Sequence, residues 1–250
     1  MKKKITQPKV LVFFILFILI FLAIVTFKPK PQKQPETTTK AAQATTSPLT
    51  NLKEITRGNI TKKEVIFTFD GGGTVQSADQ ILKTLSKHHI KGTFFLTGKM
   101  IEANPDLVKR IAKEGHEIFN HTYDHPFLTK ISNEQITSEL INMEKVLVKD
   151  TGLSPKPYFR APYGARNARV LEMAALAGYQ SIYWTVDALD WMNPQKITAD
   201  QVKTRILSSL APGNIYLMHL GDSISGAILD DVFTTIESKG YKIVSLTQGI

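Results

Sequence analysis

The strongest constraint on the fold is an alternation of apolar runs and helical patterns from residue 64 to the end of the chain. Short apolar runs are typical of buried strands, and the segments between them repeat apolar residues at helical spacing. We predict strands at residues 65–69, 92–96, 117–120, 158–160, 179–186, 214–218 and 241–246. An alternation of this kind, repeated about seven times, is typical of a parallel α/β fold.

Both a (β/α) barrel and an open doubly wound sheet satisfy this pattern. Gly71-Gly72-Gly73 follows the first predicted strand, but no P-loop lysine comes after it, and no G-x-G-x-x-G motif follows any strand. A nucleotide-binding fold is therefore disfavoured. The chain has no cysteine, which excludes disulfides, thiol catalysis and cysteine metal ligands.

Polar residues stand at the carboxyl ends of five predicted strands, where a barrel would gather its active residues. These residues are Asp70, His121, Arg160, Asp187 and His219. His125 follows His121 by four residues, and neutral imidazole is the commonest protein ligand for zinc-like metals. The His pair alone is weak evidence, because a polar turn with one packed histidine fits it equally well.

Five motifs follow one another in a specific order along the chain. They are T-F-D-G-G at 68–72, H-T-Y-D-H at 121–125, R-A-P-Y-G at 160–164, D-A-L-D-W at 187–191 and L-M-H at 217–219. Their order and spacing resemble the polysaccharide deacetylase (NodB-homology) family, the family-four carbohydrate esterases, over residues 62–250. The resemblance implies a distorted (β/α) barrel with about seven parallel strands. It also implies metal-dependent hydrolysis of N-acetyl groups on the amino sugars of peptidoglycan or chitin-type oligomers.

The resemblance also implies roles for the acid and the base. Asp70 matches the family's catalytic base, and Arg160 matches the arginine that orients it. His219 matches the catalytic acid, and Asp190 and Trp191 match the pair that supports this acid. The chemistry is consistent with these roles, because a carboxylate can accept a proton from water and an imidazolium can give one to the leaving amine.

By the same resemblance, His121 and His125 match metal ligands, most simply for Zn²⁺, and the backbone N–H of Tyr163 matches an oxyanion donor. One departure concerns the first motif, in which the family usually has two adjacent aspartates, the second a metal ligand. Gly71 stands at this second place. Because zinc sites normally have at least three protein ligands, we expect a weakened site completed by water, substrate or Asp70.

The N-terminal region predicts a membrane anchor. Residues 10–27 carry no charge and reach about 27 Å as a helix, and four lysines precede them. We therefore predict a cytoplasmic N-terminus at 1–9 and a single-pass signal-anchor helix at 10–27 in the cytoplasmic membrane, with a cleaved signal peptide as the alternative. A Pro/Thr-rich extracellular linker at 28–55 should then lead to the extracellular domain at 56–250.

The charge distribution argues against nucleic acid as a partner. The net charge is +9, but residues 1–50 hold eight lysines and one acidic residue, so the remainder is nearly neutral. The expected partners are the cell-wall glycan and, through the N-terminal helix, the membrane.

Two functions of different classes fit these observations. The first is an active, membrane-tethered deacetylase of cell-wall glycan. The second is a catalytically silent NodB-like protein with a glycan-binding or structural role at the envelope, which Gly71 favours. The retained acid and base favour the first, because a binding module needs neither. Hydrolysis of another small amide by the same fold is a third, minor alternative.

Overall fold

The computed structural model describes residues 53–192 and 196–250. The strands are β1 (Glu64–Gly71), β2 (Thr93–Leu96), β3 (Glu117–Asn120), β4 (Tyr158–Phe159), β5 (Gln180–Ser181), β6 (Val186–Asp187), β7 (Ile215–His219) and β8 (Lys242–Val244). The helices are α1 (Ala78–Lys87), α2 (Gly98–Ala103), α3 (Pro105–Lys113), α4 (Asn133–Thr151), α5 (Ala168–Leu176), α6 (Ala199–Ser208), α7 (Ile224–Ser238) and α8 (Leu246–Gly249). The predicted strand–helix alternation is therefore confirmed, with α2 and α8 as helices that the periodicity did not indicate.

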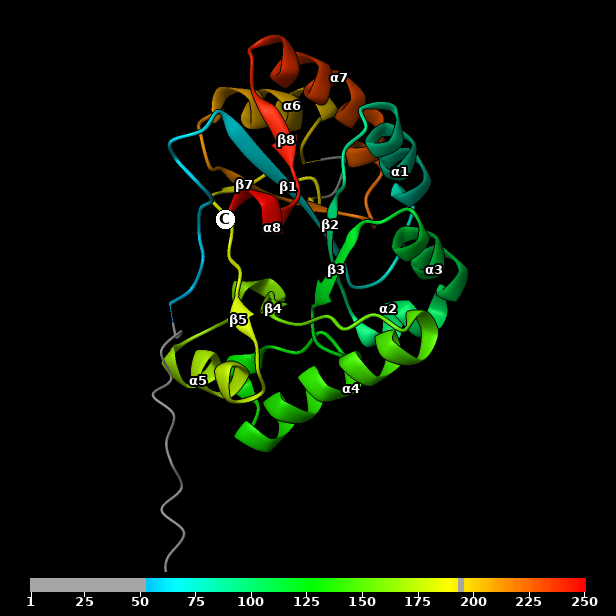
Figure 1. Cartoon of the computed structure of the whole chain (residues 1–250), viewed down its shortest axis with the longest axis vertical. Coiled ribbons are helices and arrows are strands. Elements are labelled where there is room, and N and C mark those ends of the chain that lie inside the picture. Colours follow the sequence, from blue (N-terminus) through cyan, green and yellow to red (C-terminus); the bar gives the residue numbers. More distant parts are fainter. Residues whose placement is uncertain (1–52, 193–195) are drawn as a thin grey trace, which may run out of the picture. The chain divides into compact units, whose positions relative to one another are not determined.

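All of the strand pairs are parallel, in the order β5-β4-β3-β2-β1-β7-β6. β1 lies between β2 and β7, and the short β8 pairs with its first residues, Glu64–Ile66. Apart from the short α8, whose Leu246 packs on the inner face of the strands, the helices lie outside the sheet, with α1, α6 and α7 around one end of the strand order and α4 and α5 around the other (Figure 1).

The sheet is curled, because its two edge strands belong to one short segment of chain. β5 and β6 are separated only by residues 182–185. The Ile182 N–H donates to Phe159 O of β4 at 2.9 Å, and the Thr185 N–H donates to Ile215 O of β7 at 2.9 Å. The segment thus leaves one ladder and joins the other within four residues. The expected single strand at 179–186 is wrong for this reason, whereas the expected curled parallel α/β architecture is confirmed.

The folded domain begins slightly before the expected boundary at residue 56. Ile55 forms a parallel bridge with Ile182, and its N–H donates to Ser181 O at 2.9 Å. Glu54 accepts two hydrogen bonds from the Arg166 guanidinium, both at 2.9 Å. Ile55 is an apolar residue that pairs with Ile182, between the two edge strands of the sheet.

Successive side chains of β1 point alternately into the hydrophobic core and into the cavity that contains the polar residues. Phe67 and Phe69 belong to the main core between the sheet and its helices, where the Phe67 ring stacks on Tyr216 at 4.6 Å. Because successive side chains in a strand point to opposite faces, Thr68 and Asp70 point into the curled sheet instead. The strand thereby anchors itself in the core while it presents a carboxylate at its carboxyl end.

Local signals in the sequence set the length of α4, the longest helix described. The Ser132 Oγ accepts the Gln135 N–H, and the Gln135 side chain accepts the Ser132 N–H, which forms a capping box at the start. Gly152, at a φ of 74°, ends the helix in the left-handed conformation that glycine adopts without strain.

No helix within 53–192 and 196–250 is long and apolar enough to cross a membrane. The expected anchor at 10–27 lies outside these described residues, as does nearly all of the expected linker at 28–55.

Candidate active site

A cavity of about 520 Å³ opens at the carboxyl ends of the strands, and six of the eight predicted site residues line it. These six are Asp70, His121, His125, Tyr163, Trp191 and His219. The other two are buried behind the lining, where Arg160 contacts Asp70 and His121, and Asp190 contacts His219. The structure thus brings together residues from five separate parts of the sequence.

Asp70 is an almost fully buried carboxylate that Arg160 holds in place. Arg160 Nη1 donates to Asp70 Oδ1 at 2.7 Å and to Thr68 Oγ1 at 2.8 Å. Burial by itself would raise the pKa of Asp70, but the charges of Arg160, His121 and His219 and the hydrogen bond from Arg160 hold this pKa below its usual value. Asp70 is therefore ionised at neutral pH, as a base must be.

The guanidinium of Arg160 is completely buried and contacted on several sides. Its Nε donates to Ile182 O at 3.3 Å, and its carbon lies 4.2 Å from the centre of the Phe95 ring. A planar fork of donors can bind a carboxylate, a hydroxyl and a carbonyl at once, whereas a lysine ammonium could not keep this geometry. The orientation of Asp70 is therefore determined by the core around Arg160.

His121 and His125 turn their Nε2 atoms toward each other, at 3.1 Å. The His121 Nδ1 lies 2.9 Å from Arg160 O, and since a carbonyl only accepts, Nδ1 carries the proton and Nε2 keeps its lone pair. Burial lowers the pKa of both histidines, and for His125 burial together with the neighbouring His121 lowers it to about 4. Both rings are therefore neutral at pH 7, the form that binds metals.

A polar turn fixes the spacing of this histidine pair. The Asn120 side chain accepts the Thr122 N–H at 2.8 Å, and the Thr122 Oγ1 accepts the His125 N–H at 3.1 Å. Thr122 and His125 have φ values of 70° and 61°, a left-handed conformation that is strained for residues other than glycine. The turn bends the chain so that both rings face one point.

Two imidazoles in this arrangement fit a zinc-like ion. Two nitrogen ligands of a tetrahedral zinc ion lie ~3.3 Å apart, close to the observed 3.1 Å between the Nε2 atoms of His121 and His125. Asp70 Oδ2 lies 3.6 Å from His121 Nε2 on the same side. Within the described part of the chain, however, no three His, Asp or Glu side chains form a group arranged to hold a metal.

The space that a ligand at position 71 would need is filled by apolar side chains. A Cβ added to Gly71 would lie 2.8 Å from Leu96 Cδ2 and 3.0 Å from Leu220 Cδ1. A Cβ added to Gly72 would instead lie 3.4 Å from His125 Nε2. Gly71 therefore provides no side-chain ligand, and the ends of the Leu96 and Leu220 side chains occupy the space where such a ligand would lie.

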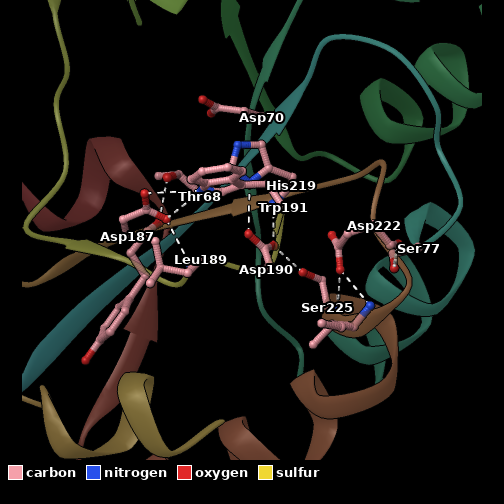
Figure 2. Close-up of polar contacts among 12 residues, drawn as sticks. Thr68, Asp70, Ser77, Asp187, Leu189, Asp190, Trp191, His219, Asp222 and Ser225 are labelled. Atoms are coloured by element: carbon pink, nitrogen blue, oxygen red, sulfur yellow. Dashed lines mark hydrogen bonds and ion pairs between the residues drawn. The ribbon is translucent and has the colours of Figure 1, made fainter. Parts of the chain in front are cut away.

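His219 lines the same cavity and is held by Asp190. Asp190 Oδ1 lies 2.9 Å from His219 Nδ1, and Asp190 Oδ2 accepts the His219 N–H at 2.7 Å. Burial opposes protonation, but the hydrogen bond and charge of Asp190 and the charges of Asp70 and Asp187 raise the pKa of His219 above its usual value. Figure 2 shows the His219 ring between Asp70 and Asp190. His219 is therefore suited to donate a proton.

Trp191 lines the cavity and is hydrogen-bonded to Asp187. Its indole Nε1 donates to both carboxylate oxygens of Asp187 at 3.3 Å, and its ring is 56% exposed at the cavity. Asp187 also accepts the Leu189 N–H at 2.8 Å. Leu189 has a φ of 64°, so the chain turns sharply there and sends Asp190 inward and Trp191 outward.

Tyr163 stands at the opposite rim with a strained backbone. Its φ is 59°, and its ring stacks on Phe127 at 4.0 Å and meets the His125 ring at 4.5 Å. Backbone strain of this kind is often found at functional sites, where the surrounding structure maintains it. The aromatic Phe127 was not among the predicted residues, because no sequence periodicity links it to Tyr163.

Three further residues support the acid side of the cavity, and sequence reasoning missed two of them. Asp187 was noted only as a strand end, and Ser225 and Asp222 were not singled out at all. Ser225 donates to Asp190, and Asp222 lines the cavity. No local signal marks these two, because they contact the site from the first turn of α7 and the loop before it.

Together these features define a class of protein, a curled parallel α/β protein with the acid–base site of a hydrolase. A family model for polysaccharide deacetylase matches residues 57–182. A peptidoglycan-N-acetylglucosamine deacetylase of Bacillus cereus is 36% identical over 193 residues, which cover 76% of this chain and 69% of that protein. The chain therefore belongs to the polysaccharide deacetylase family, as the five motifs predicted.

Two further proteins bear on activity. The peptidoglycan-N-acetylmuramic acid deacetylase PdaA of Bacillus subtilis is 34% identical over 189 residues, covering 76% of this chain and 72% of PdaA. Its structure, a family 4 carbohydrate esterase, has a TM-score of 0.75 at 32% identity and covers 79% of this chain and 84% of that one. A family 4 pseudoenzyme from Bacillus anthracis has a TM-score of 0.73 at 30% identity, with coverages of 78% and 68%.

Proposed function

We propose that the chain is a metal-dependent deacetylase that hydrolyses N-acetyl groups of amino sugars in cell-wall glycan. The observation that carries this proposal is one cavity lined by the buried carboxylate of Asp70, which Arg160 keeps ionised, and by His219, whose pKa Asp190 raises. The names of the B. cereus and B. subtilis relatives, both peptidoglycan deacetylases, support the substrate class. A protein that only binds glycan has no need of an oriented base and a charge-supported acid.

In this mechanism Asp70 accepts the proton of the attacking water, and Arg160 keeps its carboxylate ionised and correctly turned. His219 donates its proton to the leaving nitrogen, and Asp190 supports the imidazolium. The backbone N–H of Tyr163 stabilises the negative charge that develops on the acetamide oxygen. Trp191, at the rim, packs against the sugar.

His121 and His125 are the residues that would hold the divalent metal, for which Zn²⁺ is our proposal. Bound there, the metal supplies Lewis-acid polarisation of the acetamide carbonyl and promotes deprotonation of water. The two Nε2 atoms that face each other at 3.1 Å support this assignment, since both can direct a lone pair toward one cation.

The test is acetate release by the purified full-length protein, with zinc added, from peptidoglycan and from chito-oligomers. The assay includes both acetylated sugars of peptidoglycan, because the relatives are named for N-acetylglucosamine in one case and N-acetylmuramic acid in the other. We expect acetate release that Asp70→Asn and His219→Ala each lower by about 10²–10⁴-fold. No release from any of these polymers would reject the proposal.

A catalytically silent glycan-binding or structural protein is the second candidate. The observations that favour it are Gly71 at the place of a ligand and the similarity to the B. anthracis pseudoenzyme. A mutant of that pseudoenzyme with restored enzymatic activity is also similar, at a TM-score of 0.73 and 31% identity. Binding of chito-oligomers without acetate release would select this candidate.

We further propose that the domain lies outside the cytoplasmic membrane, attached through residues 10–27 and the linker at 28–55. The uncharged stretch and the lysines before it support this topology. Protease added to intact wall-less cells should then remove the domain. Protection of the domain until the cells are lysed would show the opposite topology.

A further inference from the structure

Ser225 lies between two carboxylates behind the candidate acid. Its hydroxyl donates to Asp190 Oδ2, and its N–H donates to Asp222 Oδ1 at 2.7 Å. Asp190 in turn contacts the His219 ring through Oδ1. A continuous series of hydrogen bonds therefore runs from His219 through Asp190 and Ser225 to Asp222 (Figure 2).

Asp222 is held rigidly at this position. Its Oδ1 accepts the N–H groups of Ile224 at 2.6 Å and Ser225 at 2.7 Å, which caps the first turn of α7. Its backbone carbonyl accepts the Ser77 hydroxyl from the start of α1. Its Oδ2 is buried and has no hydrogen-bond partner among the described residues. An unpaired buried carboxylate oxygen is costly, and the helix cap requires only Oδ1.

The charge state of Asp222 fits an effect on His219. Burial, and after it the negative charge of Asp190, raise the pKa of Asp222 to about 6, while the N–H groups of Ser225 and Ile224 oppose the rise. The pKa of His219 is raised above its usual 6.5. Asp222 is therefore largely ionised over the pH range in which His219 loses its proton.

Other charged or titratable groups also face His219, and their contributions must be separated from that of Asp222. They are Asp70 on β1, Asp187 on β6, Asp190 in the following loop, and His121 and His125 after β3. None of them is hydrogen-bonded to Ser225 except Asp190. A change at Ser225 therefore distinguishes the contribution of Asp222 from the rest.

We propose that Asp222 is a positioning residue for His219 that acts through Ser225 and Asp190. The role of this positioning in catalysis rests on the proposed deacetylase function. Its effect on the pKa of His219 does not depend on turnover. By fixing the Ser225 backbone, Asp222 aims the Ser225 hydroxyl at Asp190. The oriented Asp190 then holds the His219 imidazolium, and the second negative charge further favours the protonated ring.

The test measures the pKa of His219 by NMR, with ¹³C-labelled histidine rings in the full-length protein and His219→Gln for assignment. The variant is Asp222→Asn, because an asparagine oxygen still accepts both N–H groups and keeps the cap of α7. The control is Asp106→Asn, an exposed residue in the first turn of α3. We expect Asp222→Asn to lower the pKa of His219 by about 0.5, below the 1–3 units of a contacting charge, and the control to leave it unchanged.

The second step repeats the measurement in a Ser225→Ala background. If Asp222 acts through Ser225, the shift caused by Asp222→Asn should fall to less than half of its first value. The thermal midpoint of Asp222→Asn should stay within about 2 °C of the parent, since the cap is retained.

No shift in Asp222→Asn, or a shift that is undiminished in the Ser225→Ala background, would overturn the proposal. The second result would show that Asp222 acts only as a distant charge. Because the measurement needs no substrate, a protein that releases no acetate would reject the proposed function and leave this inference testable. In an active protein, Asp222→Asn should move the alkaline limb of kcat to lower pH and leave KM unchanged.

Discussion

Arg160 Nη1 lies 2.7 Å from Asp70 Oδ1, and the two side chains are 0% and 6% exposed. Two opposite charges are therefore almost completely removed from water at the carboxyl end of β1. Such a pair contributes little net stability, because desolvation offsets the attraction, but the loss of one partner leaves a buried charge unpaired. Both the orientation of the candidate base and the stability of the fold therefore depend on this ion pair.

Arg160→Met should lower the free energy of unfolding by about 3–5 kcal/mol, the usual cost of breaking a buried ion pair. Urea unfolding at pH 7 measures this. Adding Asp70→Asn to the variant should recover part of the loss, because no unpaired charge then remains. A loss near the 0.5 kcal/mol of a surface substitution would contradict the pairing.

The same pair has a consequence for pH. The pKa of Asp70 is lower in the fold than in the unfolded chain, so its contribution to stability is present above about pH 3.9. This contribution is lost as the pH falls through the lower pKa of the folded state. In Arg160→Met, unfolding measured between about pH 3 and 6 should no longer show this gain of stability with rising pH.

Asp70→Asn and His219→Ala should each lower kcat by about 10²–10⁴-fold, the usual contribution of a general base or acid. The double variant should lose less than the product of the two, because both groups act in one reaction sequence. Acetate release measures all three, with Asp106→Asn as a surface control. Activity close to wild type in either single variant would exclude that residue from the proposed role.

Gly71→Asp should tighten zinc binding, because it adds a charged oxygen near the histidine pair. Since the tips of Leu96 and Leu220 occupy the space, the variant should also lose thermal stability, and Leu220→Val should restore part of it. Gly71→Asn is the matched control, because it has the same size without the charge. Zinc titration by calorimetry measures the affinities.

Two results of this titration would count against the account of a missing ligand at position 71. One is equal affinity of Gly71→Asp and Gly71→Asn for zinc. The other is a larger gain from Gly72→Asp, since a Cβ at Gly72 lies 3.4 Å from His125 Nε2. His121→Ala should abolish zinc binding in every background.

The sequence predicted the parallel α/β fold because strand and helix periodicities are local properties. It could not predict that residues 179–186 form two strands, since the segment exchanges β4 for β7 as its partner. The apolar run indicates that the segment is buried, but it does not identify the strands with which the segment pairs. The role of Ile55 at the meeting sheet edges was missed for the same reason.

For the site, the motifs predicted residues that lie around one cavity, because each follows a strand of a curled parallel sheet. The contacts behind the cavity could not be predicted. Ser225 and Asp222 reach Asp190 from a different part of the chain, and the leucine tips over Gly71 depend on packing. The partner of Trp191 depends on the left-handed turn at Leu189, which has no glycine to mark it.

Trp191→Ala should raise KM several-fold and leave kcat nearly unchanged, if the exposed indole packs against the sugar. Trp191→Phe keeps an aromatic face but removes the Nε1 donor to Asp187. We expect this variant to stay close to wild type in KM, because stacking needs only the ring. A KM in Trp191→Phe as high as in Trp191→Ala would instead assign the effect to the hydrogen bond with Asp187.

The rate should follow a bell in pH, with His219 controlling the alkaline limb. The pKa of His219 is raised, so the active protonated form persists above pH 6.5 and is lost as the pH rises further. Asp190 supplies the hydrogen bond and the nearest charge that oppose this loss. Asp190→Asn should therefore move the alkaline limb of kcat/KM to lower pH.

The expected displacement is about one unit or more, the size of the effect of a contacting opposite charge. Asp187→Asn is the matched comparison, because Asp187 also faces His219 but makes no hydrogen bond to it. The alkaline limb should therefore move less in Asp187→Asn than in Asp190→Asn. The acid limb, which reports the base, should stay in place in both variants. An alkaline limb that does not move in Asp190→Asn would mean that a group other than His219 donates the proton to the leaving nitrogen.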